Sequence, residues 1–519
     1  MAKNEEKTSK QVTSVEKTAG RGFIVISLAK AWFMVGGVCI TFGLPMVFSW
    51  YAEDGRQLFG QYYDINNTLS IFSMVLIGGL LPAVSRFASA HKDATVHLLR
   101  IGSRTAFTLG AILLLIFYVA SDTYAEYRGH PDQNIAYICA GIICVAYAFY
   151  AVHVGLINGR QAFTTQAKLD IGFTTMKVLF IIGIACAGLG VTGAFVGFAA
   201  AAVAISLWSR TQLPPIEDAK PMPPGFVPFA CWMMLYTFAF NLSFKIDALM
   251  LRPALDALLA SSGDVDRYMG EYGLAVSLSR LPWQSTIALT FVVFPMISEA
   301  TFSEDRARTH TYIQNTIRYA LILICAVALP MCARPDFTFD CLALIIPGYT
   351  LGQAALVWLA PAYIFFSLSN LHNTIFMSSG RAKTALSLMV INLVTVYVAF
   401  STGLHEVESA STLLETASQQ LCLAFGVIGI LGAIWLTRTF GCYLSVLSVL
   451  RIAAALLIAI GLSKFFTPES LILKVATLVS LPIYFLLILW ASGELNTEDK
   501  RRFLSVFRRR KGDSSEQEH

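Results

Sequence analysis

One pattern runs through the whole chain: about fourteen apolar stretches, each close to the roughly 20 residues that cross a bilayer core, alternate with short polar loops. In hydrocarbon, only helices and closed barrels satisfy every backbone hydrogen-bonding group. Charged residues make up 14% of the chain, compared with about a quarter in soluble globular proteins. The pattern therefore predicts an all-α polytopic membrane protein with most of its surface facing lipid.

The apolar stretches predict about fourteen transmembrane helices, arranged as two six-helix lobes and a C-terminal pair. We expect spans at roughly 23–47, 66–89, 103–121, 135–157, 171–189, 191–209, 226–250, 270–298, 315–333, 343–368, 385–402, 412–436, 444–463 and 471–491. The expected parts are a disordered N-terminus (1–22), an N-lobe (23–209), a Pro-rich linker (210–225), a C-lobe (226–436), two further helices (437–491) and a basic tail (492–519).

Lys and Arg gather in alternate loops, for example Arg100 and Arg104, or Arg306 and Arg308. The intervening loops are poor in basic residues. By the positive-inside rule, both termini and the linker lie in the cytoplasm. The basic tail predicts an amphipathic helix that binds anionic lipids.

Three short motifs recur in the same order about 210–220 residues later, which predicts an internal repeat. FGQY at 59–62 returns as MGEY at 269–272, LPAVS at 81–85 as FPMIS at 294–298, and NGR at 158–160 as SGR at 379–381. Two pseudo-symmetric lobes of equal orientation would then enclose a central cavity and work by alternating access. The alternative is that small residues and prolines merely recur at helix ends.

A few ionisable residues lie within the predicted spans, where each charge costs roughly 2.5–3.5 kcal/mol on insertion scales. The cations are Arg280, Lys30, Lys177 and Lys245, and Asp247 is a candidate for ion coupling. Arg280 lies deepest, and Pro282 after it predicts a kink. The alternative for each is a structural or interfacial role. The excess of cations favours an anionic, phosphorylated group as the substrate.

Other polar residues near these spans are weaker candidates. Asn66, Asn67 and Gln284 could hydrogen-bond sugar hydroxyls. Arg86 and Glu299 close their spans on the cytoplasmic side, where they are either interfacial or paired as a gate between the lobes.

Several classes of function lack their sequence signatures. The chain has no GxxxxGK[ST] phosphate loop and no Cys/His metal spacing, so we expect no cofactor and no metal. The net charge of +5 is spread over juxtamembrane clusters, which argues against nucleic-acid binding. No long external loop offers room for the acid/base chemistry of a membrane polymerase or ligase, so we do not expect an enzyme.

Four segments resemble polysaccharide flippases of the multidrug/oligosaccharidyl-lipid/polysaccharide (MOP) exporter superfamily. They are FGQYYDINNTLSIFSMVLIGGLLPAVSRFAS (59–89), LINGRQAFTTQA (156–167), KIDALML (245–251) and MGEYGLAVSLSRLPWQ (269–284) with FPMIS (294–298). The resemblance implies two six-helix lobes in a V around a central cavity. In the related lipid II flippases, Arg residues of the first and eighth spans serve the substrate. Arg280 matches the eighth-span position, whereas Lys30 stands in the first span.

The resemblance implies a flippase for polyprenyl-pyrophosphate-linked oligosaccharide units of O-antigen or exopolysaccharide in the bacterial inner membrane. Its partners would be this lipid-linked substrate and other polysaccharide assembly proteins. The alternatives are a lipid II flippase, a cation-coupled drug antiporter of the MATE type, a major-facilitator transporter, a polysaccharide polymerase or ligase, and a scaffold of an envelope complex. A drug antiporter would call for several intramembrane acids, and this sequence shows few.

Overall fold

The structure is a computed structural model that describes residues 28–50, 52, 54–213, 224–302, 304–405 and 407–495. The predicted disordered N-terminus and most of both the inter-lobe linker and the basic tail lie outside these residues. Throughout the described part the regular elements are helices. The predicted all-α architecture is therefore confirmed.

Twelve helices of the described residues are long and apolar enough to cross a membrane. One of these segments, Phe163–Thr211, contains two helices, α5 and α6. The eighth predicted span is divided between α9 and α10 and adds one more crossing. The helices are thus compatible with about fourteen spans, and the chain is a multi-pass membrane protein.

The chain divides into two compact units. The first unit holds residues 1–277, 345–352 and 386–424, and the second unit holds the rest. In the first unit lie an initial helix (Leu28–Phe48), α2 (Gly55–Ala90), α3 (Thr95–Tyr127), α4 (Asn134–Gly159), α5 (Phe163–Ile184), α6 (Gly190–Thr211), α7 (Phe226–Ser243), α8 (Ile246–Leu258) and most of α9 (Ser262–Ser279). Helices α14 (Ala382–Gly403) and α15 (Ala410–Phe440) each run from one unit into the other.

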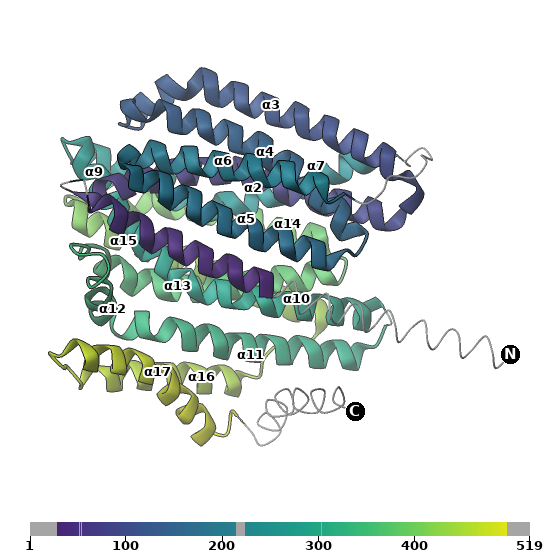
Figure 1. Ribbon diagram of the computed structural model, residues 1–519. Helices are drawn as coiled ribbons and strands as arrows, with labels where there is room; N and C mark the ends of the chain where they lie inside the picture. The colour runs from purple at the N-terminus through teal and green to yellow at the C-terminus, as the bar shows by residue number, and fades with distance from the viewer. Residues whose placement is uncertain are drawn as a thin grey trace, which may run out of the picture. The chain divides into compact units, whose positions relative to one another are not determined.

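Within the first unit, long helices pack side by side. Helix α4 contacts α2, α3 and α6, and α2 also contacts α7 (Figure 1). Helix α4 is the most enclosed of them, because it has neighbours on several sides. In its most apolar stretch, 72% of the residues are buried. Lipid-facing helices such as α3 keep large apolar side chains exposed, as expected where the surrounding solvent is hydrocarbon.

The short link between the fifth and sixth spans is a π-helical turn, Ala185–Leu189, followed by α6. Gly188 in this turn and Gly190 directly after it have φ values of +82° and +55°, a conformation that costs glycine little and other residues more. Helices α5 and α6 contact each other after the reversal. The predicted division into two spans at this Gly-rich link is therefore correct.

The first pair of repeated motifs, FGQY and MGEY, lies where α2 crosses α9. A Cβ on Gly60 would overlap the carbonyl oxygen of Asp266, and a Cβ on Gly270 would overlap the carbonyl oxygen of Arg56. These four residues form two pairs related by the 210-residue offset of the repeat. The two backbones therefore cross in close contact about a pseudo-two-fold axis, which supports the repeat.

The second unit contains α10 (Leu281–Phe302), α11 (Arg306–Ala333), α12 (Pro335–Leu342), most of α13 (Gly352–Ser378), α16 (Val446–Lys464) and α17 (Leu471–Ala491). Helix α11 contacts α10, α16 and α17. Ion pairs anchor the C-terminal hairpin of α16 and α17. The Nε of Arg318 donates to Glu494 at 2.8 Å, and the Nζ of Lys474 donates to Asp340 at 2.7 Å.

Candidate functional site

Lys30 is paired inside the first unit. Its Nζ donates to Oδ2 of Asp170 on α5 at 2.8 Å, and the hydroxyl of Tyr150 on α4 donates to the other carboxylate oxygen at 3.1 Å. Asp170 is 8% exposed. The first predicted cavity cation is therefore balanced by a buried carboxylate that the sequence interpretation did not include.

Asp170 was missed for a definable reason. The predicted fifth span begins at 171, whereas α5 begins at Phe163, two turns earlier. Loop residues are ordinarily solvated, so a carboxylate just before a predicted span carries no signal of its own. The polar pattern from Gln166 to Thr175 hides the helix start from a hydropathy window.

Lys177 lies two turns further along the same helix. Its Nζ is 4.0 Å from the centre of the Phe198 ring on α6, a cation–π contact. Among the described residues, Lys177 has no carboxylate within ion-pair distance and no hydrogen-bond partner. Lys30 is thus neutralised by Asp170 and the buried Asp64 of α2 by Arg128, whereas no carboxylate pairs with Lys177 among the described residues.

Arg280 lies at a break in the eighth span, between the end of α9 at Ser279 and the start of α10 at Leu281. Pro282 at the second position of α10 fits the predicted kink, because the first turn of a helix has no partner for the N–H that proline lacks. The Nε of Arg280 donates to the hydroxyl of Tyr363 on α13 at 2.9 Å. Tyr363 is 1% exposed, so this guanidinium points into the protein interior of the second unit.

A second break separates α7 from α8 at Phe244 and Lys245, where the sequence predicted one continuous span to 250. The expectation of an uninterrupted seventh span is corrected here. The Nζ of Lys245 donates to Oδ1 of Asn67 on α2 at 2.6 Å. Asp247 accepts a hydrogen bond of 2.9 Å from the Tyr272 hydroxyl. A predicted cation and a predicted sugar contact therefore bind each other, and the two charges at the break have separate partners.

The remaining predicted residues lie on two separate helices, α2 and α10. Asn66 and Gln284 are half-buried, on α2 and α10. Arg86 is exposed, and its guanidinium stacks 4.3 Å from the centre of the Phe229 ring. The side chain of Glu299 lies outside the described part, so the Arg86–Glu299 gate stays a prediction.

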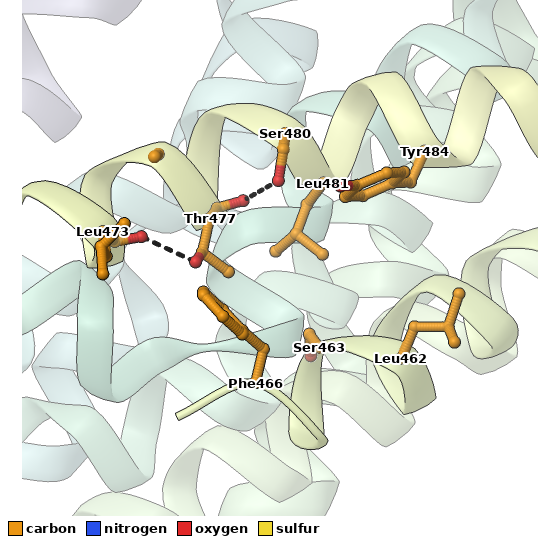
Figure 2. Close-up of a pocket in the computed structure, with 9 residues that line it drawn as sticks. Leu462, Ser463, Phe466, Leu473, Thr477, Ser480, Leu481 and Tyr484 are labelled. Carbon is orange, nitrogen blue, oxygen red and sulfur yellow. Dashed lines mark hydrogen bonds between the residues drawn. The ribbon is translucent and has the colours of Figure 1, made fainter. Parts of the chain in front are cut away.

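The C-terminal hairpin encloses a pocket that sequence reasoning did not anticipate. It measures about 480 Å³ between α16 and α17, with Leu462, Leu473 and Leu481 among its walls (Figure 2). The hydroxyl of Thr477 donates to the carbonyl oxygen of Leu473 at 2.7 Å, so its polarity is satisfied within its own helix. No charged side chain is among the described residues that line this pocket, which suits apolar chains rather than head groups.

No protein-family model and no curated protein matches the chain. Solved structures do match it. A MOP superfamily transporter from Pyrococcus furiosus, for which a reverse polarity of the binding pocket is reported, superposes with a TM-score of 0.60 at 15% identity, over 81% of this chain and 95% of that chain.

Two structures of multidrug resistance MATE family transporters of the MOP superfamily are also similar. One in an outward-facing conformation gives a TM-score of 0.61 at 13% identity, over 81% of this chain and 95% of that chain. One in an inward-facing conformation gives a TM-score of 0.59 at 14% identity, over 80% of this chain and 94% of that chain. The chain therefore has the MATE-like fold of MOP superfamily transporters.

Proposed function

We propose that this protein is a transporter that flips polyprenyl-pyrophosphate-linked oligosaccharide units across the bacterial inner membrane for cell-surface polysaccharide synthesis. Both termini lie in the cytoplasm. The head group enters a cavity from the cytoplasmic side, the polyprenyl tail stays in lipid, and alternating access exposes the sugar outside. No covalent step is needed. The MATE-like fold supports a transport function.

The observation that carries the proposal is Lys177, an intramembrane ammonium whose one partner among the described residues is an aromatic ring. A lysine at this depth is costly unless something compensates its charge. With Lys30 already bound to Asp170, Lys177 leaves a net positive charge among the first six helices. A diphosphate entering this region would gain a charge-assisted hydrogen bond in a low-dielectric environment.

Arg280 is the proposed diphosphate ligand of the second unit. Its Nε is held by Tyr363, which orients the planar guanidinium, and Arg binds phosphate oxygens bidentately. Helix breaks in transporters commonly mark substrate sites, and Arg280 lies at one. A reverse polarity of the binding pocket is reported for the Pyrococcus furiosus transporter of similar fold, which is compatible with a cationic site on this fold.

Lys245 and Asn67, which bind each other in this structure, are proposed to bind the substrate instead when it arrives. Their mutual hydrogen bond satisfies both side chains before the substrate arrives. Sugar hydroxyls would replace it, with Asn66 and Gln284 as further contacts. Asp247 would couple an ion, and Arg86 with Glu299 would gate the cytoplasmic side. Anionic lipids at the basic tail and polysaccharide assembly proteins are the proposed partners.

A cation-coupled antiporter is the second candidate, and Asp170 favours it. This carboxylate is buried between three helices with a tyrosine hydroxyl on one oxygen, an arrangement that could take up a proton when Lys30 withdraws. The multidrug resistance transporter of similar fold makes drugs the corresponding substrate class. The lipid II alternative shares the diphosphate chemistry and differs in the sugar.

The test is reconstitution of the full-length protein in proteoliposomes that contain a short-chain polyprenyl-diphosphate saccharide. Movement is read as protection of the saccharide from an external glycosidase. We expect wild type to move the saccharide, Lys177→Gln to lose most of the rate and Lys177→Arg to keep much of it. Lys168→Gln, an exposed lysine on the same helix, is the matched control.

Loss of transport in Lys168→Gln as well as Lys177→Gln would mean that the helix, not the cavity charge, is at fault. Equal transport by wild type and Lys177→Gln would refute the role of Lys177. If wild type moves a lipophilic cation but no diphosphate, the result would favour the antiporter hypothesis over the flippase. Movement of lipid II in preference to other saccharides would decide for the peptidoglycan precursor.

A further inference from the structure

Five ionisable side chains form a buried cluster beside the crossing of α2 and α9. They are each at most 4% exposed: Asp64, Arg128, His130, Arg252 and Asp266. Asp64 lies on α2, and Arg128 and His130 follow the end of α3. Arg252 lies on α8 and Asp266 on α9. The cluster therefore joins α2 and α3 of the predicted N-lobe to α8 and α9 of the predicted C-lobe, the two halves of the sequence repeat.

Each carboxylate of the cluster has its own guanidinium. The Nε of Arg128 donates to Oδ2 of Asp64 at 2.9 Å, and Nη2 of the same residue contacts Oδ1. The Nη1 of Arg252 donates to Oδ1 of Asp266 at 2.8 Å and lies 3.8 Å from Asp64. Two ion pairs, one from each half of the chain, thus lie next to each other.

His130 bridges these two pairs. Its Nε2 is 3.4 Å from Oδ2 of Asp64, and its Nδ1 is 3.5 Å from Oδ2 of Asp266. These are ion-pair contacts and not hydrogen bonds, and a protonated imidazole carries an N–H and positive charge beside each carboxylate. A neutral imidazole has one donor and one lone pair, so one carboxylate would then face a lone pair. Only the protonated His130 ring can therefore attract both carboxylates, Asp64 and Asp266, at the same time.

The surroundings of His130 are mixed in charge. Asp64 faces it from α2, Asp266 from α9 and Arg252 from α8, with Arg128 beside it in the chain. Further out lie the carboxylate of Asp256 on α8 and the phenols of Tyr124 on α3 and Tyr137 on α4. Burial acts to lower the pKa of His130, but the carboxylates of Asp266 and Asp64 raise it above its ordinary value overall.

We propose that His130 is a pH-sensitive latch, which holds the outer ends of α2 and α9 together when protonated and releases them when it loses its proton. The proposal concerns the conformational cycle and does not depend on the substrate that is carried. Separation of α2 from α9 would pull Asp64 and Asp266 apart and hydrate the cluster, so the ring would lose a carboxylate neighbour. Closure then favours proton uptake, and by linkage protonation favours closure.

The comparisons make such a separation a reasonable motion for this fold. MATE family transporters of similar fold are recorded in an outward-facing and in an inward-facing conformation. In this chain the contact of Gly60 with the α9 backbone closes the crossing sterically, and the bridged ion pairs lie next to it. Because the closed state has the raised pKa, its advantage is present at low pH and is lost as the pH rises through that pKa.

The test is a pair of nitroxide labels on the full-length protein in lipid nanodiscs. Asp132, before α4, and Asp264, on α9, are exposed on the two halves of the chain. A genetically encoded keto amino acid at both positions avoids labelling the native cysteines. Electron double resonance then gives the distance distribution at about pH 5.5 and about pH 9, on either side of the titration range of histidine.

In wild type we expect short distances at the lower pH. The ratio of long to short distances should rise on alkalinisation, by about tenfold for each pKa unit by which closure raises the His130 pKa. His130→Gln should show no pH-dependent change. His130→Arg, a permanent cation, should stay at short distances throughout. His405→Gln, which alters an exposed histidine, should behave as wild type.

A wild-type distribution that is the same at both pH values overturns the proposal. So does a pH-dependent shift that survives in His130→Gln or in His130→Arg. If His130→Gln does not fold, the comparison of wild type with His130→Arg decides alone. Loss of the shift in His405→Gln would assign the pH sensitivity to another group and would also overturn the latch.

Discussion

The ammonium of Lys30 lies 2.8 Å from Oδ2 of Asp170, and this ion pair joins the first helix to α5. The pair is unequal, because the Lys30 side chain is 34% exposed and that of Asp170 is 11% exposed. Removal of the lysine would therefore leave a largely buried carboxylate without its cation, whereas removal of the acid leaves an ammonium that can reach solvent or head groups.

We expect Lys30→Gln to destabilise the protein more than Asp170→Asn does, by about 1–3 kcal/mol, between the values for surface and buried ion pairs. The double variant should recover part of this loss. Thermal unfolding of the purified protein, followed by tryptophan fluorescence, gives the double-mutant cycle. Strictly additive effects of the two changes would contradict a direct coupling.

Arg280 depends on Tyr363 for its orientation, since the tyrosine hydroxyl accepts from the guanidinium Nε at 2.9 Å. Tyr363→Phe keeps the ring and removes this partner. A hydrogen bond to a charged group contributes about 1.5–3 kcal/mol, so we expect transport in the proteoliposome assay to fall by about tenfold. Arg280→Ala should abolish it.

The matched control for Tyr363→Phe is Tyr397→Phe, which removes the hydroxyl of an exposed tyrosine on α14. Its transport rate should equal that of wild type. Full activity of Tyr363→Phe together with loss of activity in Arg280→Ala would show that Arg280 works without this support.

The contact between α2 and α9 has no room for a side chain at Gly60. We expect Gly60→Ala to lower the Tm by several degrees, because an added methyl group must push the α9 backbone away. Overpacking of this kind costs about 1–3 kcal/mol. Gly183→Ala on α5, where nothing lies within 4 Å of the added Cβ, should be neutral or slightly stabilising.

Glu494 holds the C-terminal hairpin through two arginines, Arg318 of α11 at 2.8 Å and Arg451 of α16 at 3.6 Å. It is 3% exposed. Glu494→Gln leaves both guanidinium groups without their carboxylate, so α16 and α17 should loosen from α11. Hydrogen exchange of peptides from α16 and α17 should speed up by at least about tenfold.

The control for Glu494→Gln is Glu469→Gln in the exposed turn between α16 and α17. It removes the same charge from the same hairpin at a position without an ion pair among the described residues. Equal exchange rates in the two variants would assign any effect to charge in general and not to the anchor.

Much of the fold follows from local sequence. A run of apolar residues specifies a membrane helix because hydrocarbon offers no other partner for the backbone, so spans such as α4 and α17 lie close to their predicted limits. Pro282 marked the break at Arg280 for an equally local reason, since proline lacks a backbone N–H and so favours a helix start. Pro82 and Pro330 lie inside helices, so proline alone does not decide a break. The break at Lys245 had no such residue and was not predicted.

The charges within the membrane show the same difference between what local sequence predicts and what it does not. Composition and spacing identify Arg280, Lys177 and Lys245 as unusual, because each ion in hydrocarbon is costly wherever it lies. The sequence could not say that Lys245 binds Asn67 or that Lys30 binds Asp170, since these partners are 178 and 140 residues apart. Nor did it single out His130, whose neighbours come from helices on both halves of the chain.

The amino-acid sequence by itself determined that this protein is embedded in lipid, that it is all-α and that Gly60 is repeated at Gly270. It could do so because apolar burial and backbone geometry act over short segments. The tertiary structure alone decided which side chain pairs with each charged residue. Electrostatic energy depends on distance and on burial, and both are set only when helices from distant parts of the chain pack together.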